Sequence, residues 1–189
     1  YKIVVERYLN ASADLRAAAI VKILDALNNS EKWNDILPWA DRMIREFPNN
    51  KYMLNAVYFK GSALNMLKKY REARDAFKIL MEKDTSGSLA EIAQYQRAEC
   101  LMSMGEKSSG VKEFNAFMAK YPKSQFVANA VFQIGNYEWE QENFGVAKKH
   151  YNRIIGEFPQ FAAMCWVKNY LAFCYDKEGS WQKAKNIYI

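Results

Sequence analysis

The sequence has little of what catalytic and metal-binding sites need. Its 189 residues include one histidine, His150, which follows two lysines, and only three cysteines. A zinc site needs several Cys, His or Asp ligands at regular spacing, and the chain shows no such spacing. Glycine-rich phosphate loops and nucleophile–base pairs are also missing. We therefore expect no enzymatic activity, no metal, no cofactor and no small-molecule substrate.

Long hydrophobic runs are missing as well. No apolar segment approaches the length of a membrane-spanning helix, and no signal peptide opens the chain. The cysteines Cys100, Cys165 and Cys174 form no regular framework. On one helix, Cys165 and Cys174 would be roughly 13 Å apart, which is too far for a disulfide. We expect all three to be small buried side chains, which do not fix the redox compartment.

The composition is that of a folded protein. Hydrophobic residues make up 50% of the chain and aromatic residues 15%. These fractions argue against disorder, which requires low hydrophobicity and a high net charge. The formal charge of +6 is mildly basic, so it permits acidic partners without demanding them. Length and composition together predict one globular domain or a short array.

A repeat with a period of 37 residues organises the chain. Prolines, aromatic residues and small residues recur at this spacing or at its multiples, most completely around residues 128–159. The matched positions are Pro48, Pro122 and Pro159; Tyr70, Phe144 and Trp181; Ala73, Gly110, Ala147 and Ala184; and Phe77, Phe114, Tyr151 and Tyr188. A fixed period between 20 and 50 residues is typical of solenoid and array proteins.

Each repeat has the pattern of two amphipathic helices joined by a tight turn. The predicted repeats are approximately 15–50, 51–87, 88–124, 125–160 and 161–189. The predicted helices are 15–29, 31–47, 51–67, 70–84, 88–104 and 106–121, with two more in 128–159, and residues 1–10 match the back half of a second helix. Ser88 and Glu91 fit a capping box, and Ser124 is the expected cap of the fourth repeat. The whole chain is thus expected to be a single domain, a fragment of a longer array.

Columns of small residues predict how the two helices of a pair meet. In the first helices this column is Gly61, Ala98, Gly135 and Ala172. Small side chains let two helices approach closely, and large residues such as Phe77 then fill the gap to the next repeat. The first repeat departs from the pattern, because Leu24 and Ile36 stand in small columns and Ala40 stands in the large one.

The small columns, the leading aromatic residue and the terminal proline together resemble the tetratricopeptide repeat, over nearly the whole chain. This resemblance implies an all-α, right-handed α-solenoid of about five helix-turn-helix repeats that acts as a protein–protein interaction scaffold. The family period is 34 residues. The three extra residues here follow the proline, where we expect them to lengthen each first helix by nearly one turn.

The long repeat is similar to that of bacterial envelope members. These include the periplasmic coordinator of the Tol–Pal system and the lipoprotein scaffold of the outer-membrane β-barrel assembly machine. The resemblance therefore favours the periplasm or cell envelope over the cytoplasm.

In proteins of this resemblance, the first helices line a concave face, and their outward positions hold the ligand. Three columns of such positions follow from the period: Val21, Tyr58, Tyr95, Phe132 and Asn169; Asp25, Ser62, Glu99, Asn136 and Phe173; and Asn28, Asn65, Met102, Trp139 and Asp176. The resemblance implies that a peptide or partner helix binds to Tyr58, Ser62, Asn65, Tyr95, Glu99, Met102, Phe132, Asn136, Trp139, Asn169 and Phe173.

Aromatic rings beside amide and carboxylate groups suit such a ligand. Rings supply contact area at low entropic cost, and amides can satisfy a peptide backbone. The competing interpretation is that the rings pack against neighbouring first helices. The family's clamp for acidic C-terminal peptides is not expected, because Lys22 has no basic partner in the second or third repeat.

Two other functions stay open. The chain is a spacer that self-associates end to end if terminal apolar residues such as Ile3, Val4, Ile187 and Ile189 lie uncovered. Alternatively, basic runs on the second helices, around 68–71 and 148–153, contact nucleic acid or an anionic surface. A solvated face explains the same runs. Aromatic residues are predicted on the opposite face, so nucleic acid is the weaker choice, and His150 is expected to be exposed.

Overall fold

The computed structural model describes residues 1–6, 10–84 and 87–187. Throughout these ranges the regular structure is α-helical, which confirms the expected fold of helix-turn-helix repeats. The chain forms two compact units, an N-terminal unit of residues 1–106 and a C-terminal unit of residues 107–189. The side chain of Val4 and residues Tyr188 and Ile189, which the sequence predictions include, lie outside the described part.

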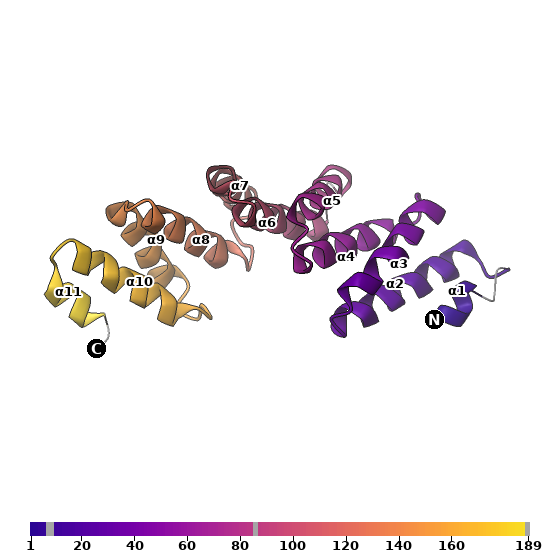
Figure 1. Cartoon of the computed structure of the whole chain (residues 1–189), viewed down its shortest axis with the longest axis horizontal. Helices are drawn as coiled ribbons and strands as arrows, with labels where there is room; N and C mark the ends of the chain where they lie inside the picture. Colours follow the sequence, from indigo (N-terminus) through magenta and orange to yellow (C-terminus); the bar gives the residue numbers. More distant parts are fainter. Residues whose placement is uncertain (7–9, 85–86, 188–189) are drawn as a thin grey trace. The chain divides into compact units, whose positions relative to one another are not determined.

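The helices of each unit follow the predicted pairs closely (Figure 1). The N-terminal unit contains α1 (Lys2–Glu6), α2 (Ala13–Asn29), α3 (Trp33–Glu46), α4 (Met53–Met66), α5 (Tyr70–Lys83) and α6 (Ser88–Ser103). The C-terminal unit contains α7 (Lys107–Lys120), α8 (Val127–Glu140), α9 (Phe144–Glu157), α10 (Met164–Lys177) and α11 (Trp181–Asn186). In the described part, none of these helices is long and apolar enough to cross a membrane.

The turn inside each helix pair is closed in the same way every 37 residues. The residue just past the first helix has a positive φ, and the five such residues are Glu31, Lys68, Gly105, Glu142 and Gly179. In the second repeat, the N–H of Lys69 donates to the carbonyl of Leu64 at 2.8 Å, and that of Lys68 donates to the carbonyl of Asn65 at 2.9 Å. This Schellman arrangement satisfies carbonyl groups that the helix end leaves without partners.

The three residues by which the period exceeds 34 form a turn rather than helix. After Pro48, the N–H of Asn50 donates to the carbonyl of Phe47 at 3.1 Å, and the N–H of Met53 donates to the carbonyl of Asn50 at 2.9 Å. Equivalent pairs of bonds follow the other two matched prolines, through Tyr121, Ser124 and Val127 and through Phe158, Phe161 and Met164. The expectation that each first helix gains nearly one turn is therefore wrong for α4, α8 and α10, which have 14 residues each, whereas α2 and α6 are longer, with 17 and 16.

A side-chain bond explains part of this difference. The Asn50 side chain accepts a hydrogen bond from the N–H of Tyr52 at 3.0 Å, and Ser124 accepts one from Phe126 at 3.1 Å. Such local bonds offer the backbone an alternative to helix. Ser124, the expected cap of α8, thus acts inside the turn, and the residue that precedes the helix is Phe126.

The start of α6 also differs from its prediction. The helix begins at Ser88 after Gly87, so Ser88 is not the capping residue. Instead, the Asp84 carboxylate accepts a hydrogen bond from the N–H of Ala90 at 3.1 Å. A Cβ on Gly87 would collide with that carboxylate. A carboxylate at a helix N-terminus also complements the helix dipole, so Asp84 helps to cap α6. The Ser88 side chain, on which the predicted capping box depends, lies outside the described part.

The small and large columns meet as the sequence indicates. A Cβ placed on Gly61 would lie 2.7 Å from the Phe77 ring, and one on Gly135 would lie 2.9 Å from the Tyr151 ring. Both rings are fully buried. In the first repeat the sizes are exchanged, since Leu24 and Ala40 lie fully buried in one core cluster. The helices of the pair thus pack with the large residue on the first helix.

The three cysteines differ in their exposure to solvent. Cys100 and Cys174 are buried and Cys165 is exposed, so the expectation that all three are buried is wrong for Cys165. Cys165 is adjacent in sequence to Trp166, which is also exposed. Burial is the main cause that raises the pKa of the Cys100 thiol to about 12 and that of the Cys174 thiol to about 11.

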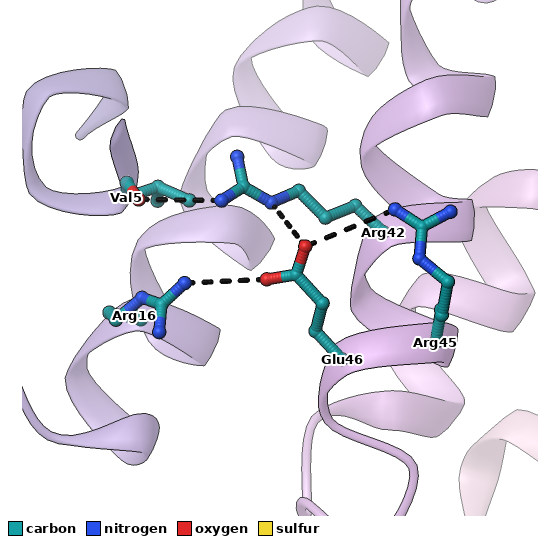
Figure 2. A network of polar contacts seen from close by, with 5 residues as sticks. All are labelled: Val5, Arg16, Arg42, Arg45 and Glu46. Atoms are coloured by element: carbon teal, nitrogen blue, oxygen red, sulfur yellow. Dashed lines mark hydrogen bonds and ion pairs between the residues drawn. The ribbon is translucent and has the colours of Figure 1, made fainter. Parts of the chain in front are cut away.

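A carboxylate joins the helices at the beginning of the N-terminal unit (Figure 2). Glu46 on α3 accepts hydrogen bonds from Arg42 at 3.0 Å and from Arg16 of α2 at 3.3 Å, and it lies 3.9 Å from Arg45. Arg42 also donates to the carbonyl of Val5 in α1 at 3.4 Å. Glu46 therefore holds side chains that reach α1, α2 and α3.

We expect Gly135→Ala to lower the free energy of unfolding by about 1–3 kcal/mol, because the new methyl group would crowd the buried Tyr151 ring. Gly156→Ala in α9 is the matched control. Nothing lies within 4 Å of its Cβ position, so this change is expected to stabilise by roughly 0.5–1 kcal/mol. Urea denaturation followed by circular dichroism measures both, and equal effects would contradict the close helix approach.

We expect Glu46→Ala to destabilise the N-terminal unit by about 1 kcal/mol, because Arg16 and Arg42 lose the carboxylate that they share. Glu82→Ala is the control, since the Lys78–Glu82 pair is mostly exposed and joins residues of one helix. The measurement is thermal unfolding at low and at high salt. A loss no larger than that of Glu82→Ala would show that the network adds little.

Candidate protein-binding surface

The three predicted columns lie where one first helix meets the next. In the N-terminal unit, the Asn65 amide on α4 donates to Gln96 on α6 at 3.1 Å, and Tyr58 packs against the core cluster that contains Phe77 and Cys100. Ser62 is half-buried on the same helix. In these repeats the columns therefore contribute to packing between neighbouring helix pairs.

Tyr95 on α6 is the most buried member of the columns. It is 7% exposed, and its hydroxyl is hydrogen-bonded to Glu99 of the next column. Burial, followed by the charge of Glu99, raises the pKa of Tyr95. Met102 and Glu99 keep part of their surface. A partner would thus reach these two side chains before the Tyr95 ring.

In the C-terminal unit the columns join an aromatic cluster. The Phe132 and Trp139 rings of α8 lie 6.1 and 5.2 Å from the Tyr170 ring of α10, and Tyr170 stacks on Tyr151 at 5.8 Å. The Tyr151 hydroxyl donates to Asn136 at 3.0 Å, and burial is the main cause that raises its pKa. Phe132, Asn136 and Trp139 thus hold α10 against its neighbours.

On α10 the same columns are open. Asn169, Phe173 and Asp176 are exposed, with 41% of the Phe173 surface accessible. They line a hollow of about 460 Å³ together with Ala172, Ala184 and Lys185. Trp166, one turn before Asn169 on the same face of α10, is 61% exposed. Asn169 and Phe173 are thus predicted site residues that lie at this accessible hollow.

Some basic residues in and beside the predicted basic runs pair with acids. Among the described residues, these pairs include Arg74–Asp75 at 2.9 Å, Lys78–Glu82 at 3.8 Å, Arg153–Glu157 at 2.9 Å and Lys148–Glu178. A nucleic-acid surface requires clustered basic residues that remain available to phosphates. In the two predicted runs, Lys68, Lys69, Arg71 and Lys149 are exposed and form no ion pair with another described residue, so pairing alone does not decide between a solvated face and an anionic partner.

His150 is half-buried, so the expectation of an exposed histidine is wrong. Its Cβ lies 3.2 Å from a Cβ placed on Gly135, which shows how closely α9 approaches α8 there. Burial lowers the pKa of His150, the Glu138 carboxylate raises it and Arg153 lowers it, and burial is the largest of these effects. Because Gly135 on α8 has no side chain, His150 on α9 can lie close to α8.

Sequence reasoning missed a second hollow, in the N-terminal unit. It measures about 450 Å³ between α3, α4 and α5, and its apolar lining residues are Ile44, Met53, Val57, Leu64, Ala76 and Ile79. Lys60, Glu72, Asp75 and Lys83 complete the lining. The fourth repeat carries His150 where this repeat carries Ala76. The small side chain of Ala76 at this position is the feature of the sequence that could have indicated the hollow.

Comparison with known proteins supports the repeat assignment. A tetratricopeptide repeat family model matches residues 92–124, from α6 to the turn after α7. No curated protein matches the chain in sequence. In the described residues, no group of His, Cys, Asp and Glu side chains is arranged to hold a metal ion.

Solved structures resemble the chain over most of its length. MamA from Desulfovibrio magneticus RS-1 is 16% identical, with a TM-score of 0.73 over 91% of this chain and 90% of that one. A tetratricopeptide repeat protein from Parabacteroides merdae is 13% identical, with a TM-score of 0.73 over 91% of this chain and 64% of that one. YrrB, described as a tetratricopeptide repeat protein with an unusual peptide-binding site, is 14% identical, with a TM-score of 0.65 over 89% and 80%. At these identities the likeness shows the fold.

We expect stability to fall as the pH drops through 6.5, the ordinary pKa of histidine. The unfolded chain protonates His150 first, because the folded pKa is lower, so stability is complete above 6.5 and is lost below it, by at most about 1.4 kcal/mol per pH unit. The readout is urea unfolding between pH 8 and 5.5. His150 is the only histidine, so His150→Gln should remove the slope, and a slope that persists would contradict this assignment.

Proposed function

We propose that the chain is a non-catalytic interaction scaffold that binds a helix or peptide of a partner protein on the face where its first helices stack. The observation that carries this proposal is the hollow on α10, because three of its lining residues, Asn169, Phe173 and Asp176, belong to the three predicted columns. Residues of the same columns on α4, α6 and α8 keep smaller accessible surfaces.

The chemistry of this hollow suits a protein ligand. Phe173 and the nearby Trp166 supply aromatic surface, Asn169 supplies an amide, and Asp176 and Lys185 supply opposite charges. Aromatic anchors with a few polar groups around them are typical of protein interfaces. YrrB, a structural relative, is described as having a peptide-binding site, and this likeness in fold supports the same class of function here.

The remaining predicted residues contribute less to the proposed binding surface. Tyr58, Ser62, Asn65, Glu99, Met102, Phe132, Asn136 and Trp139 keep part of their surface, while Tyr95 keeps little. Their packing roles position α6 and α10, and their share in a concave groove stays a prediction. The resemblance to bacterial envelope scaffolds and the placement in the periplasm stay predictions too.

End-to-end self-association is the second candidate, and exposed apolar side chains favour it. Tyr1, Ile3 and Leu15 are exposed in the N-terminal unit, and Trp166, Phe173 and Trp181 are exposed in the C-terminal unit. Sedimentation of the chain over a range of concentrations separates the two candidates. A monomer throughout would leave partner binding as the function of these surfaces.

We expect the double variant Trp166→Ala/Phe173→Ala to bind a captured partner at least about thirtyfold more weakly, the effect of losing hot-spot anchors worth about 2 kcal/mol. The measurement is a pull-down with the whole chain as bait, followed by determination of the Kd for the partner recovered. Trp181→Ala is the matched control, because Trp181 is 74% exposed but does not line the hollow. Partner recovery that is equal for both variants would contradict the proposal.

Salt dependence provides a further check on the same complex. An interface built on aromatic anchors predicts a shallow fall in affinity with salt, whereas contacts to phosphates require a steep one. A steep fall in affinity with rising salt would instead indicate that the basic second helices bind an anionic ligand.

A further inference from the structure

The packing of the repeats leaves an apolar hollow open in the N-terminal unit. It measures about 450 Å³ and lies between α3, α4 and α5. The lining residues Met53, Val57 and Leu64 of α4 are buried. Ile79 of α5, which also lines the hollow, is 43% exposed. Pockets that bind ligands have volumes of roughly 300–1,000 Å³ and mainly apolar linings.

The hollow is not the place of a following helix of the array. Both α3 and α5 pack on α4, and α6, the next helix of the chain, already packs on α4 and on α5. The helices that come before and after this position are thus both present, and the hollow remains between them. Its occupant comes from outside the stack of repeats.

The fourth repeat fills the corresponding place with a side chain of its own. His150 stands 74 residues after Ala76, which is twice the period, and it is half-buried on α9. Burial has the largest effect on the pKa of His150 and lowers it, while Glu138 raises this pKa and Arg153 lowers it, so both charges act on the imidazole. With Ala76, the second repeat lacks the ring that occupies this place in the fourth.

The surroundings of this place are polar in the fourth repeat and apolar in the second. Leu64 stands where the fourth repeat has Glu138, and Ile79 stands where it has Arg153. A polar group of a ligand would lose its hydration there without gaining a partner. An apolar side chain would gain from the burial of its surface. The ligand group that enters beside Ala76 is therefore apolar.

Two unpaired charges of opposite sign stand at the two ends of α5. Glu72 lies in the first turn and Lys83 is the last residue, and both line the hollow. They are exposed and form no ion pair with another described residue. Eleven residues of helix separate them, which corresponds to about 17 Å. The other charged lining residues are engaged, Lys60 with an aspartate of α3 at 2.6 Å and Asp75 with its neighbouring arginine at 2.9 Å.

These two charges define the order of charges on a helical ligand. An acidic residue of the ligand pairs with Lys83, and a basic residue pairs with Glu72. A ligand helix that runs antiparallel to α5 begins with the acidic residue and ends with the basic one, which is the order that its own dipole favours. A parallel helix needs the reverse order, against its dipole.

We infer that the hollow between α3, α4 and α5 binds an amphipathic helix of a partner protein that runs antiparallel to α5, with an acidic residue opposite Lys83 and a basic residue eleven positions later opposite Glu72. Apolar side chains four and seven positions after the acidic residue lie on the same face of the ligand and meet Ile79 and Ala76. This site goes beyond the proposed function, which concerns the hollow on α10.

The test uses fluorescent helical peptides built on alanine and glutamine. The first carries a glutamate near its N-terminus, leucines four and seven positions later and an arginine eleven positions later. The second replaces the glutamate with arginine. Fluorescence anisotropy with the whole chain should show binding of the first peptide and at least tenfold weaker binding of the second, because Lys83 then meets a like charge. The Lys83→Glu chain should reverse this preference.

A third peptide tests the direction of binding. It exchanges the glutamate and the arginine of the first, so it satisfies both charges of the hollow only as a parallel helix, against its own dipole. It should bind more weakly than the first peptide. Equal binding of the two would overturn the antiparallel orientation.

Variants of the chain locate the binding. Ala76→His and Ile79→Arg each introduce the residue of the fourth repeat and should abolish binding of the first peptide. Val146→Arg is the matched control for Ile79→Arg, because Val146 is 41% exposed on a second helix of the other unit. Arg71→Glu is the control for Lys83→Glu, because Arg71 is exposed on α5 but does not line the hollow. Both controls should leave binding unchanged, and circular dichroism checks that each variant stays helical.

Three results would overturn the inference: the first peptide does not bind, Lys83→Glu leaves the preference between the first two peptides as it was, or Ile79→Arg binds the first peptide as the original chain does. Self-association of the chain that Ile79→Arg abolishes would assign the hollow to a second copy instead. The proposed function fails separately, because its variants change Trp166 and Phe173 in the C-terminal unit.

Discussion

The close approach of the two helices within a repeat is the contact on which the rest of the structure depends. It exists because a glycine or alanine on the first helix faces a large side chain on the second, as Gly135 faces Tyr151. Since the pair recurs every 37 residues, each repeat presents nearly the same surface to its successor. Stacking then buries what one pair leaves exposed, and stability becomes close to a sum over neighbours.

This regularity means that the columns of one repeat form the packing surface for the next helix pair. Where another helix follows, as α10 follows α8, the columns hold that helix through rings or amides. On α10 itself the same columns are accessible and form a hollow.

The sequence alone predicted the helix pairs, the period and the small columns, because these follow from residue size and spacing. It did not predict the turn after each proline, because that turn depends on a local bond from Asn50 or Ser124 to the backbone. It also left open whether column rings face a ligand or a neighbouring helix. Tyr95 and Asn169 share a column, yet one is buried and the other exposed, since burial depends on what lies opposite. The glycines Gly105 and Gly179, 74 residues apart, were an unused signal for the left-handed turn.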